Sequence, residues 1–123
     1  MPFSLTNTTE SAQIKINFRQ FKNIVLGEKY DLSVVLNKEK LMQELHKRWL
    51  KKNGATTILS FPLTPVSGEI FLCTEYIKKE AKKYNLNYKS YLEKIYVHGL
   101  LHLKGQKHGK KMEQEEDKIL KSI

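Results

Sequence analysis

Three of the four histidines in the chain lie close together, in the segment HGLLHLKGQKH at positions 98–108. His98 and His102 are four residues apart, so on a helix both imidazoles project from the same face, one turn apart. Two ring nitrogens with that spacing can bind one metal ion at roughly 2.0–2.1 Å. Gly105 is expected to end the helix and let the chain turn back, so that His108 supplies a third ligand. The spacing therefore predicts a metal site on a helix and the loop that follows it.

Three neutral histidines would leave the fourth tetrahedral position of a zinc ion to water, which is the arrangement of a catalytic site rather than a closed structural one. Zinc lowers the pKa of such a water to about 7, which supplies hydroxide at neutral pH, and it can polarise a phosphoryl or carbonyl oxygen. Iron, manganese and nickel also accept imidazole ligands, so zinc is a preference among metals. The remaining ring N–H of each ligand needs a hydrogen-bond acceptor, which the sequence alone does not identify.

Gly99 bears on the type of hydrolase. In HExxH metalloproteases a glutamate follows the first histidine and acts as general base, whereas this chain has glycine there. A metallopeptidase would need another acid, for which Glu113, Glu115 and Glu116 are the candidates. The glycine could instead let another segment or a substrate approach the helix closely.

The charge balance indicates the class of partner. The chain has 22 Lys and Arg against 13 Asp and Glu, a formal net charge of +9. A small domain this basic usually meets RNA, DNA or an anionic membrane surface, although lysines can also serve solubility alone. No apolar run is long enough for a membrane span. The N-terminus lacks the pattern of a secretion signal, and the single Cys73 cannot form an internal disulfide, which favours the cytoplasm.

The patterning of apolar residues predicts an α+β fold. Residues 1–10 are polar and expected to be disordered, and residues 11–123 are expected to form one metal-binding domain. The predicted strands cover 14–18, 32–36, 56–61 and 69–73. The predicted helices cover 37–52, 74–84, a segment through 91–101 that stops at Gly105, and 112–120, while 19–28 is ambiguous, with a short helix ending near Gly27 as one interpretation. Strands first and helices later indicate a sheet of about four strands packed with helices.

Three segments resemble those of one known family. The signature His-Gly-x-Leu-His-Leu-x-Gly-x-x-His is matched at every fixed position of 98–108, and TTILSFP at 56–62 resembles the strand T-x-V-L-S-F-P. Gly68-Glu69-Ile70, with Cys73 and Lys79-Glu80-Ala81 after it, resembles a further segment in the same order. From about Tyr30 to the C-terminus the chain therefore resembles the YbeY family of bacterial rRNA maturation factors and single-strand-specific endoribonucleases.

The resemblance implies a mixed sheet surrounded by helices, one zinc ion per chain held by His98, His102 and His108, and a basic cleft beside it. It also implies a zinc-dependent, single-strand-specific endoribonuclease that acts in rRNA processing and small ribosomal subunit maturation. The implied partners are ribosomal RNA or pre-rRNA and small-subunit ribosomal proteins, with no membrane.

The chain departs from the family pattern in residue type at two places, and its segment between His108 and the predicted helix at 112–120 is shorter than usual. The family has Tyr-Asp before the third histidine, where this chain has Gln106-Lys107. The family arginine that engages RNA falls by spacing on Leu50, and only its neighbours Arg48, Lys51 and Lys52 are basic. These changes put the strength of catalysis in doubt more than metal binding.

Several residues are candidates for substrate contact, each with a plainer alternative. Lys104 and Lys107 could steer phosphates toward the metal or simply belong to a solvated loop. Arg48, Lys51 and Lys52 could bind RNA, or offset the dipole at the end of a helix. Ser60 could hydrogen-bond substrate from a sheet edge, or face solvent. Trp49 and most helical tyrosines are expected in the core, and Cys73 is expected to be a buried residue rather than a nucleophile.

The sequence therefore predicts a metal-dependent RNA hydrolase without an identifiable general acid. A non-catalytic, metal-stabilised ribosome assembly factor is the alternative, and a metallopeptidase is the less favoured third hypothesis.

Overall fold

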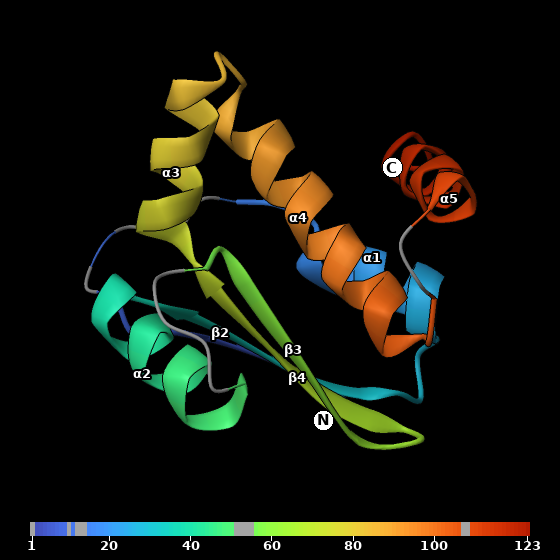
Figure 1. Ribbon diagram of the computed structural model, residues 1–123. Helices are drawn as coiled ribbons and strands as arrows, with labels where there is room; N and C mark the ends of the chain where they lie inside the picture. The colour runs from blue at the N-terminus through green and yellow to red at the C-terminus, as the bar shows by residue number, and fades with distance from the viewer. Residues whose placement is uncertain (1, 10, 12–14, 51–55, 107–108) are drawn as a thin grey trace.

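In the described part of the chain the four strands and two helices come first, up to Cys73, and three helices follow (Figure 1). The computed structural model describes residues 2–9, 11, 15–50, 56–106 and 109–123. Its elements in chain order are β1 (Phe3–Asn7), α1 (Phe18–Leu26), β2 (Asp31–Asn37), α2 (Glu39–Leu50), β3 (Ile58–Thr64), β4 (Ser67–Cys73), α3 (Thr74–Lys83), α4 (Tyr88–Leu103) and α5 (Lys110–Leu120).

The strands form one mixed sheet in the order β1-β2-β4-β3. Strand β2 pairs in parallel with β1 and with β4, whereas β3 and β4 form an antiparallel hairpin. Strand β3 therefore lies at an edge of the sheet, and it contains Pro62, a residue that sheets tolerate at such edges. The predicted α+β fold with a mixed sheet of about four strands is confirmed.

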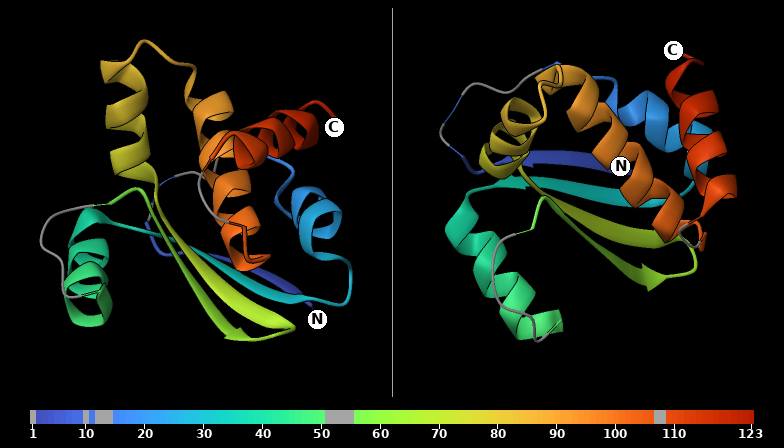
Figure 2. Two further views of the ribbon diagram at one scale, coloured as in Figure 1. Left: turned by 45° about the vertical axis from the view of Figure 1, so that its right-hand side comes forward. Right: turned by 45° about the horizontal axis from the view of Figure 1, so that its top comes forward.

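The two faces of the sheet carry different layers (Figure 2). Leu32, Val34 and Leu36 of β2 and Ile70 and Leu72 of β4 point into the main core, where they meet α1, α4 and α5. The alternate side chains of β3 and β4 point to the other face. There Leu59 and Cys73 pack with Met42 of α2 in a smaller apolar cluster. Helix α4 and helix α2 therefore lie on opposite faces of the sheet.

Helix α4 is the central element of the main core. Its N-cap residue Asn87 accepts a hydrogen bond from the backbone N–H of Ser90 at 3.0 Å, which satisfies one of the free donors at a helix start. Tyr96 is fully buried; its hydroxyl donates to the carbonyl of Phe18 at 2.8 Å, and the two rings pack edge to face. These contacts tie α4 to α1 and fix its orientation over the sheet.

Gly99 allows α4 to approach β3 closely. A Cβ atom at this position would overlap Cδ1 of Ile58 and lie only 3.0 Å from the hydroxyl oxygen of Ser60. The segment that approaches the helix at this glycine is therefore a strand of the sheet itself.

The N-terminal part of the fold differs from the prediction. Residues 3–7, expected to be disordered, form β1. The predicted strand at 14–18 is wrong, because 15–17 are irregular and Phe18 begins α1. The reason is visible in the spacing: Phe3 and Leu5 alternate with polar residues, whereas Phe18, Phe21 and Val25 recur at helical intervals.

Trp49 also differs from the prediction, since it is 63% exposed rather than in the core. The cluster beneath α2 includes Met42 and Leu45, and Trp49 lies one turn beyond them. Helical spacing predicted the correct face of α2 but could not show where the opposing apolar surface ends. Among the tyrosines, Tyr96 is buried as expected, whereas Tyr84 is 58% exposed.

Within the described residues, no helix is both long and apolar enough to cross a bilayer.

The approach at Gly99 can be tested by adding bulk to the glycine. We expect Gly99→Val to lower the free energy of unfolding by about 1–3 kcal/mol, because the new side chain must displace Ile58 and Ser60. The double variant Gly99→Val/Ile58→Val should recover part of this loss, since it removes the overlapping Cδ1 atom. Urea denaturation gives both values. Lys94→Val, at an exposed position of the same helix, controls for helix propensity and should change stability by only about 0.5 kcal/mol. A Gly99→Val variant as stable as the wild type would contradict the tight packing.

Candidate metal centre

His98 and His102 present their ring nitrogens to one another on α4. Their Nε2 atoms are 3.0 Å apart, and the rings meet edge to face with centroids 4.6 Å apart. Two nitrogens on one tetrahedral zinc, each at roughly 2.0–2.1 Å, would be about 3.3 Å apart. The pair therefore fits a shared metal ion with only a small adjustment of the rings.

The core packing of α4 explains why the pair lies where it does. The residues of α4 that are buried against the sheet and neighbouring helices include Val97, Gly99, Leu100 and Leu101. His98 and His102 lie beside them on the same helix and are only partly exposed. Because the helix is held on several sides, the two imidazoles start from a rigid backbone. Such rigidity favours a preformed binding site over one assembled only by the ligand.

The third predicted ligand, His108, lies outside the described residues, as does Lys107. Helix α4 ends at Leu103, and Gly105 takes a φ of 101°, which is the left-handed conformation that glycine adopts after a helix. Among the described residues, no three His, Cys, Asp or Glu side chains are grouped so that they could hold a metal ion. Two of the three proposed ligands are thus placed together, and the role of His108 stays a prediction.

Glu116 contacts His98, and its position in the sequence did not indicate this contact. Its carboxylate forms a hydrogen bond with Nδ1 of His98, the ring nitrogen opposite to the one that faces His102. Glu116 is only 3% exposed and lies on the buried face of α5 with Met112 and Ile119. The spacing Met112, Glu116, Ile119 was the signal that places this glutamate on the apolar side.

Gln106 joins the loop after α4 to α5. Its side-chain N–H donates to Glu115 at 2.9 Å, and its buried oxygen has no hydrogen-bond partner in the described part of the chain. The residue that departs from the family's Tyr-Asp pattern therefore still connects this loop to the neighbouring helix. Adjacent residues of α5, Glu115 and Glu116, thus contact the loop and the helix that together carry the histidines.

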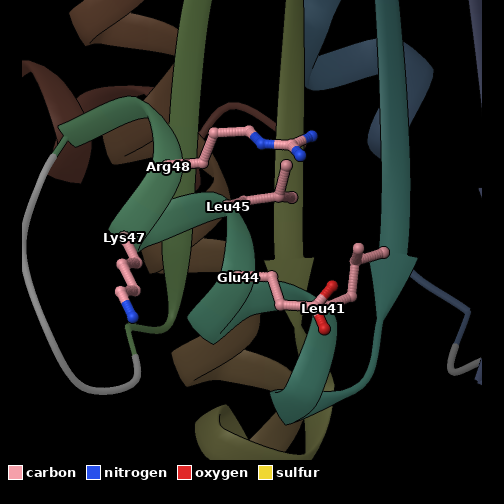
Figure 3. A pocket seen from close by; sticks show the side chains of 5 residues that line it. All are labelled: Leu41, Glu44, Leu45, Lys47 and Arg48. Carbon is pink, nitrogen blue, oxygen red and sulfur yellow. The ribbon is translucent and has the colours of Figure 1, made fainter.

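The basic candidates on α2 lie apart from the histidines. Arg48 and Lys47 line a groove of about 490 Å³ together with Leu41, Glu44 and Leu45. Figure 3 shows Arg48, Leu45 and Leu41 extending from one side of α2, whereas Lys47 points to the other. Because α2 and α4 occupy opposite faces of the sheet, Arg48 is not beside the imidazole pair. Leu50 is the last residue of α2, and Lys51 and Lys52 lie outside the described residues.

Two other candidates are close to α4. The hydroxyl of Ser60 lies 3.5 Å from the carbonyl oxygen of Gly99, so this serine faces the helix rather than open solvent. Lys104 follows α4 directly and is exposed. Cys73 is fully buried, and burial raises the pKa of its thiol, which opposes the thiolate form that a nucleophile needs. The structure therefore brings together His98, His102, Glu116 and, next to them in the chain, Lys104.

Comparison with known proteins identifies relatives over nearly the whole chain. The model of the family described as Endoribonuclease YbeY matches residues 4–123. A protein of that name from Pelagibacter ubique is 33% identical over 138 residues, covering 94% of this chain and 90% of the relative. Another from Aliarcobacter butzleri is 31% identical over 110 residues, covering 85% of this chain and 77% of the relative.

A solved structure agrees with this relationship at the level of the fold. The solution structure of TM1509 from Thermotoga maritima superimposes with a TM-score of 0.71 and 22% sequence identity, covering 97% of this chain and 87% of that one. At this level of identity the likeness concerns the fold alone. The family match over residues 4–123, with a relative 33% identical over 94% of this chain, shows that the chain belongs to the YbeY family.

Proposed function

We propose that the protein is a zinc-dependent endoribonuclease that cleaves single-stranded RNA during rRNA processing and small-subunit maturation in the cytoplasm. Membership of the family, and relatives named Endoribonuclease YbeY, support cleavage of RNA. The main support for metal dependence is that the Nε2 atoms of His98 and His102 converge. The ring of His98 also forms a hydrogen bond with the buried carboxylate of Glu116.

His98 and His102 would hold the ion, with His108 proposed as the third ligand. The donor set fits zinc, because neutral imidazole nitrogens are among its preferred ligands. When bound, zinc supplies Lewis acidity that makes water a better nucleophile at neutral pH and offsets negative charge on a phosphoryl oxygen.

The chain's own residues would bind and orient the RNA. Lys104, at the end of α4, is the described cation closest in the chain to His102, and Lys107 is proposed to act beside it. Both would offset phosphate charge near the site. Arg48, Lys51 and Lys52 are proposed to bind a more distant part of the strand. The contact of Ser60 with the Gly99 carbonyl favours a role in seating α4 over direct contact with substrate.

A non-catalytic ribosome assembly factor is the second candidate. In this case the metal would stabilise the fold, and the basic surface would bind pre-rRNA or a small-subunit ribosomal protein. The observations that favour it are Leu50 at the place of the family arginine and the position of Arg48 across the sheet from α4. A metallopeptidase is less favoured, because glycine stands where the general-base glutamate would follow His98. Glu116, a candidate replacement, contacts Nδ1 of His98 and not the side on which the two imidazoles converge.

The ligand assignment predicts that metal and activity are lost together. We expect His102→Ala to fall from about one zinc per chain to a small fraction of that, since two imidazoles hold the ion far less tightly than three. Elemental analysis and cleavage of a labelled single-stranded RNA measure the two effects. His46→Ala, which changes the fourth histidine on α2, is the matched control and should keep both. Normal zinc content in His102→Ala would refute the assignment.

Removal of the metal separates the two candidate functions. For the endoribonuclease, we expect chelated protein to stay folded by circular dichroism, because the main core includes none of the proposed ligands, and to regain cleavage when zinc is restored. For the assembly factor, the zinc-loaded protein would show no cleavage and chelation would unfold it.

The basic residues predict salt-dependent RNA binding. In the presence of a chelator, which prevents cleavage, Lys104→Gln should reduce the slope of log affinity against log salt by about 0.7, the value for one lost phosphate contact on single-stranded nucleic acid. Fluorescence anisotropy with a labelled oligonucleotide measures the slope. Lys83→Gln, at the last residue of α3 and so just before the start of α4 in the chain, whereas Lys104 follows the end of α4, should leave it unchanged. Equal slopes for wild type and Lys104→Gln would exclude a phosphate contact at Lys104.

A further inference from the structure

Glu116 of α5 is buried at a position where an apolar side chain would have a lower desolvation cost. Met112, Glu116 and Ile119 form the buried face of this helix, whereas Glu113 and Asp117 are exposed. A buried carboxylate is unfavourable unless it is paired or hydrogen-bonded. The partner of Glu116 is Nδ1 of His98. The burial of Glu116 is therefore explained by its contact with a proposed metal ligand.

This contact involves the ring nitrogen of His98 that points away from His102. Where Nδ1 of a neutral imidazole donates this hydrogen bond to the carboxylate, Nε2 is left without a proton. The other nitrogen, Nε2, then bears the lone pair. Nε2 is the atom that lies 3.0 Å from Nε2 of His102. The lone pair of His98 then lies at the point where the two rings converge.

We propose that Glu116 is a positioning residue that holds His98 in its metal-binding tautomer and orientation, which makes α5 a part of the metal centre. This inference rests on the proposed function, because it assumes that His98 binds zinc. Carboxylates that accept the second ring N–H of a ligating histidine fix the ring and raise its basicity.

The neighbouring contact strengthens the attachment of α5. Glu115 accepts a hydrogen bond from Gln106 at 2.9 Å, two residues before His108. Helix α5 thus contacts α4 through Glu116 and the start of the following loop through Glu115. Met112 and Ile119 pack in the main core, so the backbone that carries both carboxylates is held in place.

Zinc affinity tests the proposal directly. Glu116→Leu keeps an apolar residue of suitable size on the buried face and removes the acceptor, and we expect its zinc dissociation constant to rise 10–100-fold. Competition with a chromophoric chelator gives this value without any assay of activity. Asp117→Asn removes the same charge from the exposed neighbouring position and should bind zinc as the wild type does.

A second measurement reports on the tautomer. In the zinc-free wild type, ring nitrogen shifts from NMR should show His98 protonated at Nδ1. In Glu116→Leu the Nε2-protonated form should appear. Glu116→Gln retains an acceptor oxygen, so its loss of affinity should be smaller than that of Glu116→Leu. If the leucine variant fails to fold, the glutamine variant and the wild-type tautomer decide the question.

The outcomes distinguish this proposal from the function on which it rests. Wild-type zinc affinity in both Glu116 variants, or an Nε2-protonated His98 in the wild type, would overturn the positioning role alone. A wild type that binds no zinc would overturn both the metal-dependent function and this inference.

Discussion

The close contact between α4 and β3 is the constraint on which the rest of the structure depends. Helix α4 is both the centre of the main core and the carrier of His98 and His102, and it can serve both purposes because Gly99 has no side chain to hold it away from Ile58. A helix displaced outward would loosen the packing around Tyr96 and Leu100. It would also move the imidazoles relative to α5. Core packing and site geometry are thus one problem in this fold.

Much of this arrangement could be predicted from local pattern. The histidine spacing placed His98 and His102 on one helical face, and the strands predicted at 32–36 and 69–73 agree with β2 and β4 within a residue or two of their bounds. The strand at the N-terminus was missed because Phe3 and Leu5 form too short an alternation to stand out. At Phe18 two patterns overlap: the alternation that predicted a strand at 14–18 and the helical spacing of Phe18, Phe21 and Val25. The structure follows the helical spacing.

The role of Glu116 and the exposure of Trp49 could not be predicted for a different reason. Both depend on what another element of the fold presents to them. Glu116 is buried because α5 lies across α4, and Trp49 is exposed because the apolar surface under α2 ends before it. A single sequence shows the face of a helix on which a residue lies. It does not show what covers that face, and a charged residue within an apolar stripe is therefore easily read as solvated.

The position of β3 at the edge of the sheet has a consequence for the behaviour of the protein in concentrated solution. An edge strand leaves backbone donors and acceptors that another chain could pair with, and this is a common start of aggregation. Pro62 lies in this strand and has no N–H to offer, so a strand added along the edge would meet a gap in its hydrogen-bond ladder. Strand β3 pairs only with β4 within the sheet. Pro62 therefore disfavours the pairing of β3 with a strand of another molecule, which would extend the sheet from one chain to the next.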